Sequence, residues 1–171
     1  QAFSIAGYRK GFDDPKNRGN LFFDIAKILK ARNPEGFMLE NVKNLKSHDG
    51  GNTFKVIEET LRDLGYHVKS KVLNTMDYGN VPQNRERIYI VGFKNKNYSD
   101  KFEFPSPIKL TVKITDLLEK NVDEKYYYNG KSLFDKLKKD VNQEGVVYQW
   151  RRQYVRENKS GVCPTLTANM G

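Results

Sequence analysis

The chain has 171 residues, 37% hydrophobic and 12% aromatic, which suffices for one compact core with a small second lobe. Its 30 Lys and Arg residues against 21 Asp and Glu residues give a net charge of +9. This charge favours a polyanionic partner, but a lysine-rich surface without such a partner would have the same charge. A single cysteine excludes an internal disulfide framework, and two histidines give no zinc-ligand cluster, so no metal is expected.

The ends and the hydropathy of the chain predict where it belongs. Position 1 is Gln rather than Met, so we expect the chain to be a fragment of a longer protein. No apolar run approaches the length of a membrane span or a signal peptide. We therefore expect a cytoplasmic protein without a membrane partner.

The first predicted element is a helix that Asn20 caps and Pro34 ends. Its apolar positions recur at three- and four-residue spacing and are Leu21, Ile25, Ile28 and Leu29. A short buried strand over residues 36–39 then runs into Glu40. A second helix follows, in which Gly65 forms a left-handed C-cap. The apolar face of this helix comprises Phe54, Ile57, Leu61 and Leu64.

Two further strands are predicted, at residues 66–73 and 88–93. The first has a wet face with His67, Lys69 and Lys71, and the second is almost continuously apolar. Alternation of helices and strands is typical of an open α/β sheet, in which ligands bind beyond the carboxyl ends of the strands. Glu40 is expected at such an end. Periodicity fades after Phe93, and we place a domain boundary near Pro105, between residues 1–105 and 106–171.

Two polar motifs flank these strands, and neither is decisive alone. Glu40 could simply cap the segment that follows its strand. Arg85 and Arg87, which alternate with Glu86 before an apolar strand, could form a solvated surface ladder. Their order and spacing along the chain carry more information than either motif.

Together with four other segments, these motifs resemble the bacterial DNA (cytosine-5)-methyltransferases over most of the chain. The matching segments are QAFS (residues 1–4), RGNLFF (18–23), ENVKN (40–44), LNTMDYG (73–79), VPQNRERIY (81–89) and PTLTA (164–168). The resemblance implies the second half of a Rossmann-like S-adenosylmethionine-dependent methyltransferase sheet. Part of a small, mostly β target-recognition domain would follow it.

The chemistry of this family explains why such residues are needed. Carbon-5 of cytosine is a poor nucleophile towards the methyl group of S-adenosylmethionine until a thiolate adds to carbon-6. Electron density then moves onto N3, where a carboxylic acid can protonate or hydrogen-bond the ring. The resemblance assigns this role to Glu40, the cytosine O2 to Arg85 and a phosphate to Arg87. Asn41 belongs to the catalytic motif, where we expect it to fix the turn after the strand.

The resemblance also implies that a cytosine is flipped out of double-stranded DNA and that a mobile loop closes behind it. Residues 1–16 form a glycine-hinged basic stretch suited to that loop, with Ser4 on a phosphate. The implied cofactor is S-adenosylmethionine, for which Leu21 is the only expected contact in this chain. The other implied DNA contacts are Gln1, Gln83, Arg152, Arg156 and Thr165.

Two departures from the family pattern predict that this chain alone is inactive. The nucleophilic cysteine is missing. The single cysteine, Cys163, lies beside Pro164 in the recognition region, where a packing role is expected. The glycine-rich cofactor motif is missing as well. We therefore expect the N-terminal half of the same enzyme to be a partner of this chain in restriction-modification.

Three alternatives stay open. A related branch methylates transfer RNA, and a split enzyme could use this chain as a non-catalytic DNA-binding subunit. Residues 149–171 interleave basic and aromatic side chains, which suits DNA contact. The same segment could instead be a partly solvated strand pair with Trp150 and Tyr154 as core anchors.

Overall fold

The computed structural model describes residues 21–151, 153–158 and 161–166. Within them the chain forms two compact units. The first comprises residues up to 73 together with 86–106, and the second comprises 74–85 together with 107 onwards. The division after residue 106 lies next to the expected boundary at Pro105. The sequence did not predict that residues 74–85 group with the second unit.

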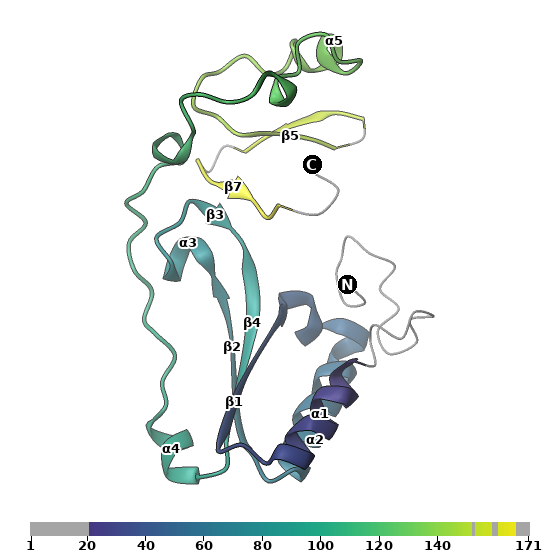
Figure 1. Ribbon diagram of the computed structural model, residues 1–171. Helices are drawn as coiled ribbons and strands as arrows, with labels where there is room; N and C mark the ends of the chain where they lie inside the picture. The colour runs from purple at the N-terminus through teal and green to yellow at the C-terminus, as the bar shows by residue number, and fades with distance from the viewer. Residues whose placement is uncertain (1–20, 152, 159–160, 167–171) are drawn as a thin grey trace. The chain divides into compact units, whose positions relative to one another are not determined.

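The first unit alternates helices and strands as predicted (Figure 1). Its elements are α1 (Leu21–Arg32), β1 (Gly36–Val42), the 3-10 turns η2 (Lys43–Lys46) and η3 (His48–Gly51), α2 (Asn52–Asp63), β2 (His67–Asn74), β4 (Glu86–Phe93) and α4 (Lys96–Lys101). Helix α4 was not expected, because residues 94–101 are polar throughout. Its N-cap is Asn95, whose side chain accepts a hydrogen bond from the Asn97 backbone N–H.

The three strands form one sheet in the order β1-β4-β2. Strands β1 and β4 are antiparallel, with Gly36 opposite Phe93 and Val42 opposite Arg87. Side chains alternate between the faces of a strand, so this register decides which residues share a face. Ile88 and Ile90 point to the face that the helices cover, whereas Arg87 lies on the other face with Glu40.

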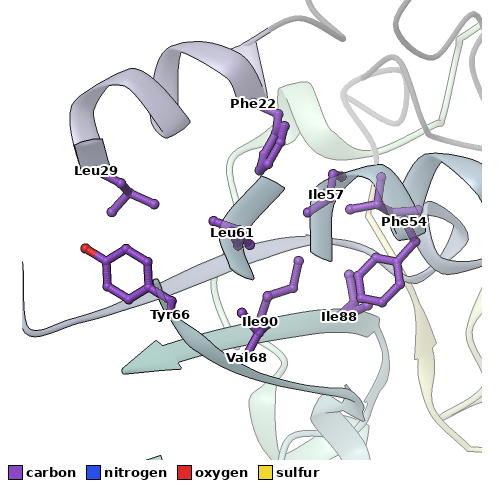
Figure 2. Packing of buried hydrophobic residues seen from close by; sticks show 10 residues of the cluster. Phe22, Leu29, Phe54, Ile57, Leu61, Tyr66, Val68, Ile88 and Ile90 are labelled. Atoms are coloured by element: carbon purple, nitrogen blue, oxygen red, sulfur yellow. The ribbon is translucent and has the colours of Figure 1, made fainter. Parts of the chain in front are cut away.

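The core lies between this sheet and the two long helices, which run side by side over one face (Figure 1). Figure 2 shows side chains from α1, α2, β2 and β4 converging there. Leu61 and Ile88 are completely buried. Burial of a large aliphatic side chain contributes about 1.5–3 kcal/mol, so these residues anchor the sheet to the helices.

Helix α1 ends as predicted but turns a different face to the core. Asn33, in the left-handed region at φ 42°, follows the last helical residue and precedes Pro34. The buried residues are Phe22, Ala26 and Leu29. The expectation was wrong for two of the four residues, because Leu21 and Ile28 are 59% and 61% exposed. This helix is apolar on several sides, so its sequence period does not determine which side is buried.

Helix α2 confirms its prediction in detail. Phe54, Ile57 and Leu61 are buried. At its end the Gly65 N–H donates to the Arg62 carbonyl at 2.8 Å, and the Tyr66 N–H donates to the Leu61 carbonyl at 3.2 Å. With Gly65 at φ 84°, this is a Schellman motif, which satisfies carbonyls that the helix leaves without partners.

Strand β2 has the predicted pattern with one difference. His67 is exposed and Val68 is buried, as expected. Lys69 and Lys71 are half-buried, and Lys69 Nζ donates to the Phe102 carbonyl at 2.8 Å. The predicted wet face is therefore partly covered by the chain beyond α4.

The face of the sheet opposite the helices carries an apolar hollow. It has a volume of about 620 Å³ and is lined by side chains that include Met38, Tyr89, Val91 and Phe104. Met38 is 69% exposed there.

The second unit consists of short elements. They are α3 (Thr75–Tyr78), β3 (Gln83–Asn84), η4 (Ile114–Leu117), η5 (Glu124–Tyr126), α5 (Phe134–Leu137), β5 (Tyr148–Trp150), β6 (Val155–Glu157) and β7 (Cys163–Pro164). Strands β5 and β6 form an antiparallel pair, and β3 pairs with β7 in parallel. Among the described residues, no helix is long and apolar enough to cross a membrane.

Candidate active site

The strand register brings Glu40 and Arg87 together at one edge of the sheet. Glu40 lies opposite Tyr89, and Arg87 lies opposite Val42, so the two are diagonal neighbours on one face. Arg87 Nε lies 3.0 Å from Glu40 Oε1. The Arg87 side chain is only 14% exposed and the Glu40 side chain is 44% exposed. The carboxylate is thus held by a largely covered guanidinium yet stays accessible.

A second bond fixes the Arg87 guanidinium. Its terminal nitrogen donates to the backbone carbonyl of Glu86 at 2.8 Å. The family resemblance suggested Arg85, not Arg87, as the arginine beside Glu40. The structure pairs Glu40 with Arg87, because β1 and β4 bring residues 40, 42, 87 and 89 to one face, while Arg85 precedes β4.

The neighbouring residues add a second charge pair. The ammonium of Lys43, which follows β1, pairs with the Glu86 carboxylate, the first residue of β4. Lys43 and Glu86 each lie in a matching segment of the sequence, but their pairing was not predicted. Asn41 Oδ1 accepts a hydrogen bond from the Val42 N–H at 2.8 Å, within β1 rather than in a turn after it.

Arg85 belongs to the second unit, where its backbone is held on both sides. The Arg85 N–H donates to Asn74 Oδ1 at 2.9 Å. Its carbonyl accepts from the Thr75 N–H at 3.1 Å. The sequence did not predict this role of Asn74, the last residue of β2, because the bond joins residues 11 positions apart.

Two motifs that are far apart in the sequence, at residues 81–89 and 164–168, also meet in the second unit. Gln83 pairs with Cys163 in the β3–β7 ladder, and the Cys163 N–H donates to the Pro82 carbonyl at 2.7 Å. Thr165 Oγ1 donates to the Asn84 carbonyl at 2.8 Å. Gln83 and Thr165, which the resemblance assigns to DNA contact, connect the two motifs in the structure. Burial raises the pKa of the Cys163 thiol above its ordinary value.

The β5–β6 hairpin separates its aromatic side chains. Trp150 lies opposite Val155 and is half-buried, whereas Tyr154 is 60% exposed. Arg156 is exposed and lies opposite Gln149 on the other face from Trp150. Trp150 therefore suits a packing role, as the alternative expected, but Tyr154 does not.

Several expected site residues lie outside the described part of the chain. They are Gln1, Ser4 and Arg152, together with the predicted loop at residues 1–16. Leu21, the expected cofactor contact, begins α1 with a largely exposed side chain. Among the described residues, no group of three or more His, Cys, Asp or Glu side chains is arranged to hold a metal ion.

Comparison with protein families gives a match over almost the whole chain. The model for the C-5 cytosine-specific DNA methylases matches residues 1–170. The chain is 54% identical over 174 residues to the type II methyltransferase M.Bsp6I of Bacillus sp. (strain RFL6). That match covers 99% of this chain and 55% of the relative. It is 52% identical over 134 residues to M1.ScrFI of Lactococcus lactis subsp. cremoris, covering 77% of this chain and 33% of the relative.

A solved structure agrees with these relatives. The Entamoeba histolytica methyltransferase EhMeth superimposes with a TM-score of 0.54 at 26% identity, over 74% of this chain and 38% of that chain. The predicted α/β methyltransferase fold is thereby confirmed. The chain spans 33–55% of the length of the two curated relatives. With a family match over residues 1–170 and 54% identity to a relative over 99% of this chain, the chain belongs to the C-5 cytosine-specific DNA methylases.

Proposed function

We propose that this chain is the middle-to-late part of a DNA (cytosine-5)-methyltransferase of type II restriction-modification. The observation that carries the proposal is the Glu40–Arg87 pair, a carboxylate oriented by a guanidinium whose side chain is only 14% exposed. The names of the relatives support the reaction. The term complete enzyme below means this chain joined to the rest of the relatives' length. That part can come from its own gene or from M.Bsp6I.

In the proposed mechanism, Glu40 acts on the extruded cytosine. After a thiolate adds to carbon-6, negative charge develops at N3. The Glu40 carboxyl group donates a hydrogen bond or its proton to N3, and the carboxylate that remains pairs with Arg87. Arg87 holds one carboxylate oxygen, which fixes the direction of the other towards the ring. A group aimed before the reaction begins needs no reorganisation as the charge develops.

The geometry favours exchanging the roles that the sequence suggested for the two arginines. Arg87 is 14% exposed and already bonded to Glu40 and Glu86, which suits the closed base pocket. A phosphate contact needs a guanidinium that can reach the DNA backbone. We therefore assign the base-facing position to Arg87 and the phosphate to Arg85.

DNA binding is proposed to use the second unit as well. The face of the β5–β6 hairpin that carries exposed Arg156 and Tyr154 combines a cation with an aromatic ring. Such a face suits contact with a DNA groove or backbone. Because Glu40 could not reach a base inside a duplex, the target cytosine must be flipped out.

S-adenosylmethionine would supply the methyl group when bound. Of the described residues, Leu21 offers an exposed apolar side chain that fits an edge contact with such a cofactor. The other contacts are assigned to the remainder of the complete enzyme. This chain alone is proposed to be inactive, because its one cysteine, Cys163, lies in β7 in the recognition region and not in the family's nucleophile motif.

The test is transfer of labelled methyl to defined substrates. The complete enzyme should methylate carbon-5 of cytosine in duplex DNA and leave transfer RNA unmodified, and this chain alone should transfer nothing. Methylation of transfer RNA alone would favour the related branch. DNA binding by the complete enzyme without any transfer would favour a non-catalytic subunit.

A further inference from the structure

Asn74 makes an unusual set of contacts at the end of β2. It is the N-cap residue of α3, a position that favours asparagine because the side chain can bond the helix N–H groups. In this protein the side chain makes no such bond to α3. Instead, Asn74 Oδ1 accepts from the Arg85 N–H at 2.9 Å, and Nδ2 donates to Asn84 Oδ1 at 2.9 Å.

The next residue completes the grip on Arg85. The Thr75 N–H and hydroxyl both donate to the Arg85 carbonyl, at 3.1 Å and 3.3 Å. Arg85 lies between β3 and β4, so neither strand includes its backbone groups. The last residue of β2 and the first residue of α3 therefore take the place of a strand neighbour and bind both polar backbone groups of Arg85. The Arg85 N–H also donates to the Gln83 carbonyl at 3.0 Å.

We infer that Asn74 is a positioning residue, which fixes the backbone of Arg85 so that its guanidinium meets the DNA. The inference rests on the proposed function, in which Arg85 contacts a phosphate. An arginine side chain is long and has many rotamers, so its reach depends on where its backbone is held. A misplacement of about 1 Å can cost a large part of such a contact.

Asn80 provides a matched control. It belongs to the same unit and uses the same kind of bond, since its Oδ1 accepts from the Thr111 N–H at 2.8 Å. It holds the backbone of Thr111 and not that of Arg85. Asn80 has a positive φ of 49°, so replacement by alanine adds backbone strain and disturbs local structure at least as much as at Asn74.

The experiment measures DNA affinity against salt concentration and single-turnover methylation in the complete enzyme. The variants are Asn74→Ala, Arg85→Ala, the double variant and Asn80→Ala. Arg85→Ala should make the salt slope shallower by about one unit, the change expected for one lost phosphate contact. Asn74→Ala should shift the slope in the same direction. It should add nothing in the Arg85→Ala background, because residues that act through one contact are not additive.

Asn80→Ala should leave the salt slope unchanged even if it lowers the melting temperature. The inference is overturned if Asn74→Ala behaves like Asn80→Ala, or if its effect persists in full when Arg85 is already alanine. If Asn74→Ala does not fold, Thr75→Val decides, since it removes only the hydroxyl bond to Arg85. A smaller shift in the same direction supports the inference, and no shift overturns it.

The Arg85→Ala variant separates this inference from the proposed function. If Arg85→Ala slows the chemical step and leaves the slope intact, the phosphate assignment is wrong. Positioning by Asn74 still holds in that case if Asn74→Ala slows the same step without additivity. If Arg85→Ala changes neither quantity, both ideas fail.

Discussion

Arg87 Nε lies 3.0 Å from Glu40 Oε1, although the two residues are 47 positions apart in the sequence. The pair exists because β1 and β4 are antiparallel and place both residues on the face opposite the helices. Because the Glu40 side chain is 44% exposed, solvent screens this pair, and its contribution to stability is at most about 1 kcal/mol. Orientation of the carboxylate therefore explains the pair better than stability does.

Replacing Glu40 by Gln tests the carboxylate. In the complete enzyme, Glu40→Gln should lower the single-turnover rate about 10²- to 10⁴-fold, the usual size of acid–base assistance. DNA affinity should stay within a few-fold, since the charge at N3 develops only during the reaction. Glu59→Gln on α2 is the control, because Glu59 is exposed and pairs only loosely with Lys55, at 3.8 Å. An unchanged rate in Glu40→Gln would make Glu40 a structural residue.

Replacing Arg87 by Ala tests the role that we assign to this residue beside Glu40. Arg87→Ala should slow the chemical step about 10²- to 10³-fold, because the carboxylate loses its orienting partner. The salt slope of DNA binding should stay unchanged. Stability should fall by about 1 kcal/mol or less, because the Glu40 side chain, 44% exposed, can be solvated when unpaired. A shallower slope for Arg87→Ala with intact chemistry would restore the assignment that the sequence suggested.

Tyr66 tests the hydrogen bonding of the core. Its hydroxyl donates to the Pro34 carbonyl at 2.9 Å, and the Lys94 ammonium lies 4.2 Å from its ring. Tyr66→Phe should lower the free energy of unfolding of the complete enzyme by about 1 kcal/mol, because a part-buried hydrogen bond to the Pro34 carbonyl is lost. Tyr98→Phe, at an exposed site on α4, should change it by less than about 0.5 kcal/mol. Equal effects in urea unfolding would contradict the assignment.

The same tyrosine predicts a loss of stability in alkali. Burial, and then the neighbouring Glu35 carboxylate, raise the pKa of Tyr66 above its ordinary value. Its contribution is fully present below the unfolded pKa of about 10 and is lost as pH rises through the higher folded value. Tyr66→Phe should therefore flatten the dependence of the free energy of unfolding on pH above about 10. A dependence unchanged by this substitution would show that another group titrates.

Cys163 is predicted to be a poor nucleophile. Burial raises the pKa of its thiol, and the reactive thiolate therefore forms only at higher pH than for an ordinary cysteine. Alkylation by iodoacetamide at neutral pH, measured on the peptide that contains Cys163, should be slower in the folded protein than in urea. The rate should rise as the pH increases. Rapid alkylation of folded protein at neutral pH would reopen a chemical role for this residue.

Local sequence determined the helices and strands of the first unit, except α4. The period of three and four residues in α2, the glycine after it and the apolar run of β4 depend only on neighbouring residues, and each was confirmed. The motif order led to the family, which the comparisons confirmed. These features could be predicted because periodicity and capping act over a few residues.

Tertiary structure alone decided which residues meet. The register of β1 and β4 placed Arg87 beside Glu40, a pair that the order of the motifs did not predict. Packing selected Phe22 over Leu21 in a helix that is apolar on several sides. Hydrogen bonds at Asn74 and Thr165 assigned the arginine motif's first half to the second unit. Each depends on contacts between residues far apart in the chain, which local periodicity does not encode.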